Sequence, residues 1–344
     1  MGTPAAELVK SVLGEHGPLL QHALAGYLDA DAAGCDVYAL ASDYPRRGGR
    51  GLRASLCMAS ARAFGARLED ALDSAISLEL LHNAFLVHDD VEDESEERRG
   101  RPTLHRLHGI PTAINVGDAL AVMSLRPLIA NQRRLGPRLT LRILAEAERM
   151  ARESVEGQAI ELRWRRENAL ELSESDYLRM ILKKTCWYTT IYPCRIGALI
   201  GTRDGAALDD SLRFGFFLGA AFQIQDDLLN LVGDPLRYGK EIGGDIWEGK
   251  RTLMLIHLLG AANPSERRDL TESLARPRVE RSQAEIDWIL ERMHHYASID
   301  YARNMAHGLA GAALHEFDRA FGALPDSRDK HFLRALPSWV LERA

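Results

Sequence analysis

Two short clusters of carboxylate and amide side chains are the parts of this sequence best suited to chemistry. The first contains Asp89, Asp90 and Asp93, and it follows the apolar run 84–87. If that run is helical, Asp89 and Asp93 lie one turn apart with Asp90 beside them, so three carboxylates converge on one spot. Like charges this close repel, and the apolar approach offers no counter-charge, so a bound cation is expected. Oxygen-only ligands indicate Mg²⁺.

The second cluster repeats this geometry. Gln223, Asp226, Asp227 and Asn230 end the apolar run 214–224, and Asp226 and Asn230 share a helix face. One such cluster could equally be a solvated helix end, but two of them, each at the polar end of an apolar helix, favour a metal site. If the helices face each other, the carboxylates form a rim above an apolar cavity, which suits a molecule with a diphosphate head and a hydrocarbon tail. Mg²⁺ commonly binds one or two carboxylates plus substrate phosphates, so the protein supplies part of each shell.

Basic side chains near both clusters are suited to phosphate oxygens. Arg98 and Arg99 follow the first cluster in a short turn, and forked guanidinium groups match diphosphate geometry. Two further arginines lie one helical turn apart, a histidine precedes Asp89 by two turns, and three lysines lie in or beside loops. These residues are Arg50, Arg53, His82, Lys184, Lys240 and Lys250. A lone histidine is usually a core residue and a lone Gly-Lys pair usually a turn, so the constellation carries the argument.

The sequence predicts that almost all of the elements that position these residues are helices. Apolar residues recur at three- and four-residue spacing, and Ala, Leu, Glu and Arg dominate. Glycine, proline and charge cluster at 43–51, 98–111, 131–137, 201–206, 232–249 and 262–265. No break resembles a domain linker. We therefore expect an all-α fold, with residues 1–344 in one domain of about ten or more helices around a central apolar cavity.

Composition excludes several classes of function. The net charge is −6, and the 43 basic residues are spread among 49 acidic ones, so nucleic acid is not an expected partner. The four cysteines lack CxxC spacing and disulfide-scaffold density, which indicates a reduced setting. The start has no signal-peptide layout, and the longest strongly apolar run, 214–224, is far short of the ~20 residues of a membrane span. We expect a cytoplasmic protein that does not cross a bilayer.

Taken together, these segments resemble the trans-prenyl diphosphate synthase family over about residues 48–252. The family's two aspartate-rich motifs are similar to residues 89–93 and 222–230, and its basic turn is similar to residues 98–103. Its glycine-flanked basic pair, Gly-Gln motif and lysine-threonine pair are similar to residues 49–53, 157–158 and 184–185. The resemblance implies an isoprenoid synthase fold, a homodimer, and isopentenyl diphosphate and allylic diphosphates as substrates.

The resemblance also implies a role for each motif residue. Two or three Mg²⁺ ions would bind with the substrate diphosphate on oxygens from Asp89, Asp90, Asp93, Asp226, Asp227 and Asn230. The allylic diphosphate would be gripped by Arg98, Lys184, Lys240 and Lys250, and isopentenyl diphosphate would lie against Arg50, Arg53, His82 and Arg99. The mechanism carried over is ionisation, attack by the isopentenyl double bond and proton loss to diphosphate, with oxygen dipoles from Thr185 and Gln223 facing the carbocation.

Some positions depart from the family pattern. Arg50 replaces the usual lysine, Glu161 fills a frequent aspartate position, and Asn230 replaces the last aspartate of the second motif. Asn230 keeps an oxygen ligand but lacks one negative charge, which weakens metal binding in principle. Trp187 and Tyr188 form a bulky pair whose direction the sequence does not assign, and rings entering the cavity would change product length or outcome.

Product length in this family depends on what blocks the tunnel below the first motif. Phe85 lies one turn deeper than Asp89, and the small Ala84 lies beside it, so a longer tail is expected to pass and the product is expected to be geranylgeranyl diphosphate. A longer-chain synthase, a terpene cyclase and a non-catalytic partner subunit are the alternatives. A cyclase would not need the isopentenyl-binding residues, and a partner subunit usually loses one acidic cluster.

Overall fold

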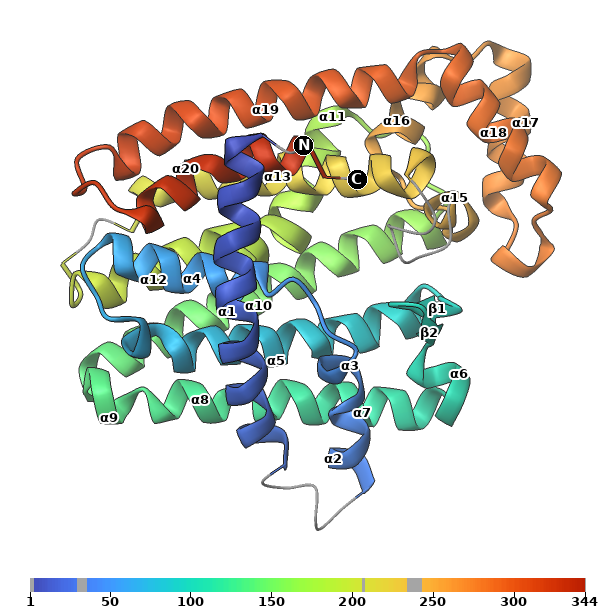
Figure 1. Cartoon of the computed structure of the whole chain (residues 1–344). Coiled ribbons are helices and arrows are strands. Elements are labelled where there is room, and N and C mark those ends of the chain that lie inside the picture. Colours follow the sequence, from blue (N-terminus) through green and yellow to red (C-terminus); the bar gives the residue numbers. More distant parts are fainter. Residues whose placement is uncertain (1–2, 30–35, 206–207, 234–242, 344) are drawn as a thin grey trace.

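The computed structural model describes residues 3–29, 36–205, 208–233 and 243–343, and nearly all of them are helical (Figure 1). A short antiparallel hairpin pairs β1 (Glu97–Arg98) with β2 (Arg101–Pro102). The all-α prediction is confirmed, and the hairpin occupies the basic turn after the first acidic cluster. Lys240 lies outside the described residues.

The helices follow in chain order with short connections. The first group comprises α1 (Pro4–Asp29), α2 (Asp36–Ala41), α3 (Asp43–Arg46), α4 (Leu52–Ala63) and α5 (Leu68–Glu92). The second comprises α6 (Leu104–His108), α7 (Ile110–Met123), α8 (Leu125–Ala130), α9 (Gln132–Leu135), α10 (Pro137–Arg166), α11 (Glu174–Ile181), the π-helix η1 (Leu182–Ile191), α12 (Tyr192–Gly201) and α13 (Asp210–Val232). The last comprises α15 (Gly244–Glu248), α16 (Leu253–Ala261), α17 (Pro264–Ala275), the 3₁₀ helix η2 (Arg278–Glu280), α18 (Gln283–His295), α19 (Ser298–Phe321) and α20 (Arg328–Leu341).

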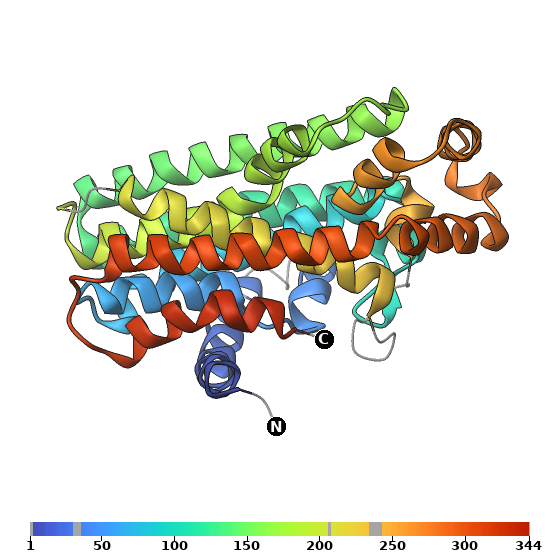
Figure 2. The same cartoon turned by 90° about the horizontal axis from the view of Figure 1, so that it is seen from above.

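The long helices form a bundle, and α1 lies steeply across it (Figures 1 and 2). Helix α13 packs against α19 and η1, α5 packs against α7 and α4, and η1 also packs against α10. The two acidic motifs are therefore at the ends of α5 and α13, on different elements of one bundle.

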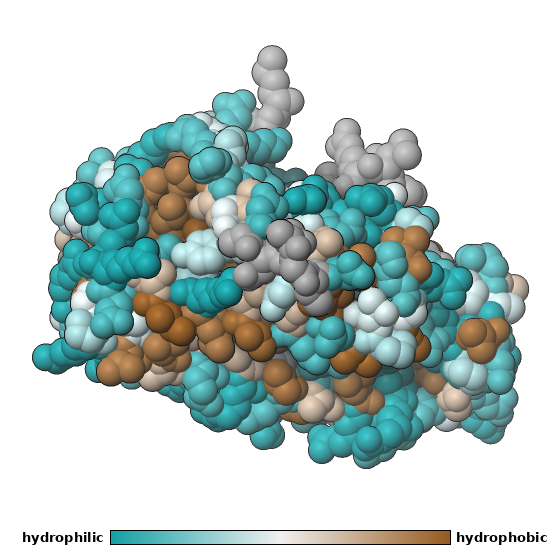
Figure 3. Space-filling view, turned by 90° about the horizontal axis from the view of Figure 1, so that it is seen from below, coloured by the Kyte–Doolittle hydropathy of each residue, from teal (hydrophilic) through white to brown (hydrophobic). Residues whose placement is uncertain are grey.

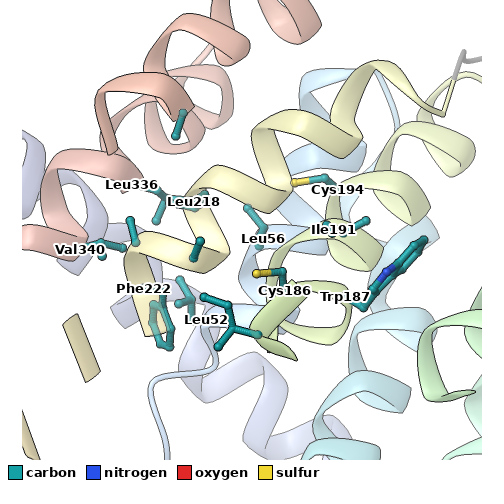
Figure 4. Close-up of a cluster of buried hydrophobic side chains, with 14 of the residues drawn as sticks. Leu52, Leu56, Cys186, Trp187, Ile191, Cys194, Leu218, Phe222, Leu336 and Val340 are labelled. Carbon is teal, nitrogen blue, oxygen red and sulfur yellow. The ribbon is translucent and has the colours of Figure 1, made fainter. Parts of the chain in front are cut away.

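Two apolar clusters hold the bundle together. The larger joins α4, η1, α12 and α13 with the C-terminal helices, and Figure 4 shows its side chains from η1 and α13. The smaller joins α1, α5 and α7. Removing apolar surface from water stabilises such clusters by roughly 25 cal/mol per Å².

Helix α10 shows how sequence spacing selects a buried face. Its buried positions recur every three or four residues, as a helix with one inward face requires. They include Ile143, Ala147, Met150, Ser154, Gly157, Glu161 and Trp164. Gly157 and Glu161 thus point inward by the same periodicity that buries the apolar residues.

Glycines allow the helices around η1 to approach very closely. A Cβ on Gly157 of α10 would lie 2.1 Å from the backbone nitrogen of Lys184. A Cβ on Gly219 of α13 would lie 2.5 Å from Thr190 Oγ1, and one on Gly215 would lie 2.8 Å from the Ile191 Cα. The π-helix is therefore held between two backbones with no room for side chains, which fixes the residues it carries.

One stretch, Ile110–Leu135, has the length and apolar composition of a membrane-crossing helix, so the expectation that no stretch reaches that length is wrong. A single such stretch is weak evidence, since core helices of soluble proteins pass the same test. Here 44% of the most apolar window is buried, and the stretch is divided into α7, α8 and α9, which pack against α5 and α10.

The close approach of α10 to η1 predicts that Gly157→Ala destabilises the protein. The added methyl group must displace the η1 backbone, and overpacking of this kind costs about 1–3 kcal/mol. Thermal and urea unfolding followed by circular dichroism measure the loss. Gly308→Ala on the exposed face of α19 is the control, because nothing lies within 4 Å of a Cβ there. Equal effects of the two substitutions would contradict the packing argument.

Candidate active site

A cavity of about 690 Å³ opens between the ends of α5 and α13. Most of the residues selected from the sequence line it: Arg50, Arg53, His82, Phe85, Asp89, Arg98, Arg99, Lys184, Thr185, Gln223, Asp226, Asp227 and Lys250. Apolar side chains complete its wall, among them Leu86, Leu162, Met180, Ile181 and Phe222. Both acidic clusters and both sets of basic residues thus face one space that has polar and apolar parts.

The first acidic cluster is divided among different partners. Asp89 lines the cavity, but Asp90 is fully buried and accepts hydrogen bonds from Arg98 Nε (2.9 Å) and the Tyr44 hydroxyl (2.5 Å). Asp93 follows the last residue of α5 and pairs with Lys250 at 2.7 Å and Arg165 at 2.5 Å. The expectations of three converging carboxylates and of no counter-charge are therefore wrong.

The reason for this division is helical geometry together with buried cations. Successive residues of a helix point about 100° apart, so Asp90 turns away from Asp89 and toward the hairpin. Burial raises the pKa of Asp93, but the Lys250 ammonium and other cations lower it by more, so the net pKa lies below its usual value. Carboxylates this deep need such partners, since an unpaired buried charge is very costly.

Lys184 connects the first acidic cluster to α10. Its Nζ lies 2.8 Å from Glu161 and 3.5 Å from Asp89. Burial lowers the pKa of Lys184, but these two carboxylates raise it more, so the net shift is upward. Gly157 and Glu161 are one turn apart on the same face of α10. Gly157 therefore leaves space for the η1 backbone, and Glu161 pairs with the Lys184 ammonium.

The second acidic cluster is also engaged. Arg343, close to the end of the chain, places Nη2 2.6 Å from Asp226 Oδ1, and its guanidinium lies 4.2 Å from the Phe222 ring centre. Asp227 accepts hydrogen bonds from the Tyr177 hydroxyl and Gln223 Nε2, both at 2.7 Å. Burial and the neighbouring Asp245 carboxylate raise the pKa of Asp227 to about 8, although those hydrogen bonds lower it.

Asn230 lies one turn beyond Asp226, but its side chain binds the backbone at the start of α15. Its Oδ1 accepts a hydrogen bond from the Asp245 backbone nitrogen at 3.0 Å, and Asn230 is absent from the cavity lining. The asparagine therefore fixes the start of α15, which carries Asp245 into the cavity wall.

The donor set suits a hard cation shared with a ligand. Within the described ranges, no group of three or more His, Cys, Asp or Glu side chains is arranged to hold a metal ion. Asp89, Asp226 and Asp227 nevertheless present carboxylates to the cavity, and the buried Asp226 Oδ1 has no aligned hydrogen-bond donor. Mg²⁺ characteristically takes one or two carboxylates and completes its shell with phosphate oxygens and water.

Basic residues gather on the other side of α5. Arg53 Nη1 lies 3.3 Å from His82 Nε2, and the Arg99 guanidinium donates to the Tyr44 carbonyl. Burial, followed by the nearby arginine charges, lowers the pKa of His82 well below its usual value, so the ring is neutral at pH 7. Burial and the charge of Arg343 likewise lower the pKa of Arg50. This concentration of cations is a ready site for a polyanion.

The hairpin that carries Arg98 and Arg99 is held by residues that the sequence did not single out. Arg47 donates to the carbonyls of Arg98 and Pro102 and stacks over the Tyr44 ring at 4.6 Å. Tyr44 in turn binds Asp90. Tyr44 in α3 and Arg47 directly after it precede the recognised basic pair by a few residues, in a segment that periodicity alone does not interpret.

Other functional contacts also escaped sequence reasoning. Arg165 and Tyr177 hold Asp93 and Asp227, and Arg343 reaches Asp226 from the far end of the chain. Arg165 follows Glu161 by four residues on α10, a spacing that could have revealed it. No local signal marks Tyr177 or Arg343, because their partners are distant in sequence.

The two expected chain-length residues occupy different environments. Phe85 lines the cavity, whereas Ala84 is fully buried in the smaller core cluster between α5 and α7. Ala84 therefore does not line the cavity beside Phe85, where the longer tail is expected to pass. Adjacent helical residues point about 100° apart, which explains why Phe85 faces the cavity and Ala84 does not.

Comparisons with known proteins show which family this chain resembles. The profile of the family described as polyprenyl synthetase matches residues 36–293. A geranylgeranyl pyrophosphate synthase of Geoglobus acetivorans is 32% identical over 89% of this chain and 91% of the relative. A short chain isoprenyl diphosphate synthase of Methanothermobacter thermautotrophicus is 34% identical over 86% of this chain and 87% of the relative.

A solved structure matches over nearly the whole chain. The geranylgeranyl pyrophosphate synthase of Corynebacterium glutamicum, complexed with isoprenyl diphosphate and magnesium, superposes with a TM-score of 0.85 and 26% identity. The match covers 98% of this chain and 99% of that one.

The buried pair of Asp90 and Arg98 predicts a large stability loss for Asp90→Asn. The change leaves a buried guanidinium without its closest counter-ion, and removing one partner of a buried ion pair costs about 3–5 kcal/mol. We expect a cost of about 3 kcal/mol, at the lower end of this range, because Asp89 remains 3.7 Å from Arg98. Denaturant unfolding measures the loss. Asp29→Asn is the control, since its partner Arg46 is 64% exposed and surface pairs contribute less than about 1 kcal/mol. Similar losses would refute the buried-pair interpretation.

Proposed function

Because this chain belongs to the polyprenyl synthetase family, we propose that it is a trans-prenyltransferase that condenses isopentenyl diphosphate head-to-tail with an allylic diphosphate. The observation that supports this most directly is the shared cavity. Carboxylates from α5 and α13 and two groups of basic residues line one space with an apolar wall. Diphosphate heads and a hydrocarbon tail fit these two parts.

Asp89, Asp226 and Asp227 are the residues that would hold magnesium, and Asp93 would join them by releasing Lys250 to the diphosphate. When bound, the metal supplies Lewis-acid stabilisation of the charge on the departing diphosphate. Asp90 would act indirectly, because it holds Arg98 at the cavity.

Lys184, Lys250 and Arg98 would bind the departing diphosphate. Nearby carboxylates raise the pKa of each above its usual value despite burial, so all three are charged throughout the neutral range. Fixed cations need little reorganisation as negative charge develops on the leaving group, which favours ionisation of the allylic carbon–oxygen bond. Lys240 is proposed as a further diphosphate ligand from the sequence.

Thr185 is the dipole best placed to face the carbocation. Its hydroxyl donates to Gln223 Oε1 at 2.8 Å, while Gln223 Nε2 donates to Asp227 at 2.7 Å. This chain of hydrogen bonds engages the hydroxyl proton, so the oxygen lone pairs of Thr185 would remain available to a cation in the cavity that it lines. Gln223 would then orient Thr185 more than contact the cation itself.

Arg50, Arg53, His82 and Arg99 would bind isopentenyl diphosphate. All four line the cavity, and Arg53 Nη1 lies 3.3 Å from His82 Nε2. Such a second anion site is required for condensation and has no use in the cyclisation of a single allylic diphosphate. The geometry therefore favours the synthase over the cyclase.

We propose geranylgeranyl diphosphate as the product. The apolar wall contains Phe85, Leu86, Met180, Ile181 and Phe222, which together leave room for a tail beside the polar end. The relative from Geoglobus acetivorans carries the same product in its name. Ala84 would act through the packing of α5 and not by direct contact with the tail.

The proposed reaction predicts a metal-dependent linear product. The purified protein would be incubated with isopentenyl diphosphate, Mg²⁺ and either dimethylallyl, geranyl or farnesyl diphosphate, and the products identified by mass spectrometry. We expect a C20 diphosphate, lost on addition of EDTA and restored by excess Mg²⁺. A longer linear product would refute the chain-length proposal alone. A cyclic hydrocarbon formed without isopentenyl diphosphate, or no turnover with any primer, would refute the synthase.

We further propose a cytoplasmic homodimer in which the whole chain acts as one domain. Large apolar side chains are exposed along α6, α7 and α8: Leu107, Ile110, Ile114, Val122, Leu125 and Ile129. Brown patches are visible in Figure 3, on the side where Figure 1 places α7 and α8. An apolar surface of this extent is unusual on a monomer, and a second copy would remove it from water.

Charge on this apolar surface is predicted to separate the subunits. The double change Val122→Glu and Ile129→Glu would place desolvated charges in the interface, so we expect light scattering after gel filtration to report a monomer. Val279→Glu is the control, because Val279 is 83% exposed on η2, away from the apolar surface. Dimers in all three proteins would exclude α7 and α8 as the interface.

A further inference from the structure

Tyr188 is a cavity residue that belongs to none of the motifs assigned above. Its hydroxyl accepts a hydrogen bond from Arg53 Nη2 at 3.0 Å. The Arg53 guanidinium carbon also lies 4.5 Å from the centre of the Tyr188 ring, within cation–π range. Tyr188 thus contacts, through both its hydroxyl and its ring face, a guanidinium that we assign to isopentenyl diphosphate.

The same ring extends to the apolar part of the cavity. Phe85 meets it edge-to-face, with ring centres 5.6 Å apart and an interplanar angle of 86°. The His82 ring is tilted against it at 5.9 Å. One side chain therefore bridges the basic residues Arg53 and His82 to Phe85 in the tunnel wall.

The π-helix explains why Tyr188 enters the cavity and Trp187 does not. Lys184, Thr185 and Tyr188 line the cavity, as the wider turn of a π-helix brings residues four apart nearly into register. Trp187 is 4% exposed and lies in the core (Figure 4). The Arg149 guanidinium carbon lies 4.6 Å from the centre of its ring. Of these two neighbouring aromatic residues, Tyr188 therefore lines the cavity and Trp187 packs in the core.

The close packing of η1 makes the position of Tyr188 rigid. Thr190 Oγ1 donates to the Gly215 carbonyl at 2.6 Å, and Gly157 and Gly219 leave no gap on either side of the helix. Since η1 has no room to rotate, the Tyr188 ring defines a fixed boundary. A fixed ring can both orient a neighbouring cation and limit the space open to a growing chain.

We propose that Tyr188 is a specificity-determining residue of the condensation, with two separable contributions. Its hydroxyl positions Arg53 for the diphosphate of isopentenyl diphosphate. Its ring, packed on Phe85, forms the wall between the isopentenyl subsite and the tunnel that receives the growing chain. This inference rests on the synthase function proposed above, and it adds a residue that sets substrate affinity and product length.

Two substitutions separate the contributions. Tyr188→Phe keeps the ring and removes the hydroxyl, so the KM for isopentenyl diphosphate should rise about five- to tenfold, as loss of one typical hydrogen bond implies, with kcat and product length unchanged. Tyr188→Ala also opens the wall, so the product distribution should move to chains longer than wild type. Trp187→Phe is the matched control, and it should alter neither quantity.

Steady-state kinetics, product mass spectrometry and calorimetric binding of isopentenyl diphosphate give independent readouts. An unchanged KM and affinity in Tyr188→Phe would overturn the positioning role. An unchanged product in a folded Tyr188→Ala would overturn the wall. Changes of the same size in Trp187→Phe would show a structural effect and overturn both roles. If wild type binds isopentenyl diphosphate but does not turn over, the synthase proposal fails while the affinity comparison still decides the role of the hydroxyl. If wild type binds none, both proposals fail.

Discussion

The structure depends on the compensation of buried carboxylates by buried cations. Ion pairs offset the repulsion and the desolvation cost of the carboxylates at the end of α5. These pairs are Asp90 with Arg98, Asp93 with Lys250 and Arg165, and Asp89 with Lys184. The pairs of Asp89 and Asp93 join elements that are distant in the chain, whereas Arg98 follows Asp90 by only eight residues. Together the pairs tie the hairpin, α10 and η1 to α5. The charge pattern that we propose to bind a diphosphate and its metal would thus be in place before either binds, which would lower the reorganisation needed on ionisation.

Close backbone packing makes that electrostatic arrangement precise. Gly157 lets α10 approach the start of η1, and Gly219 lets α13 approach its middle. Because side chains cannot fit in these contacts, η1 has little freedom to shift, and Lys184 and Thr185 have fixed positions. Densely packed interiors deform little, so a methyl group added at such a contact is felt at the cavity.

The cavity has charged and apolar parts, and the helix face that each residue occupies decides which part it lines. We assign the cations of Arg50, Arg53, His82 and Arg99 to one anion site and those of Arg98, Lys184 and Lys250 to the other, and all of them line the cavity. Tyr188 lies where the anion sites and the apolar wall meet. Two diphosphates and one hydrocarbon tail can therefore be held at once, and this is the geometric requirement of head-to-tail condensation.

The sequence by itself determined the helical class, the two acidic motifs and most of the basic residues, because helical periodicity and motif spacing are local properties. It placed Phe85 correctly in the cavity but could not separate it from Ala84, whose neighbours come from α7. Tertiary structure alone decided that Asp90 and Asp93 face buried cations, that Arg343 reaches Asp226 and that Tyr188 enters the cavity while Trp187 is buried. Most of these outcomes depend on contacts between residues tens to hundreds of positions apart, although Arg98 follows Asp90 by only eight residues. Burial of charge is set by such partners and not by local spacing.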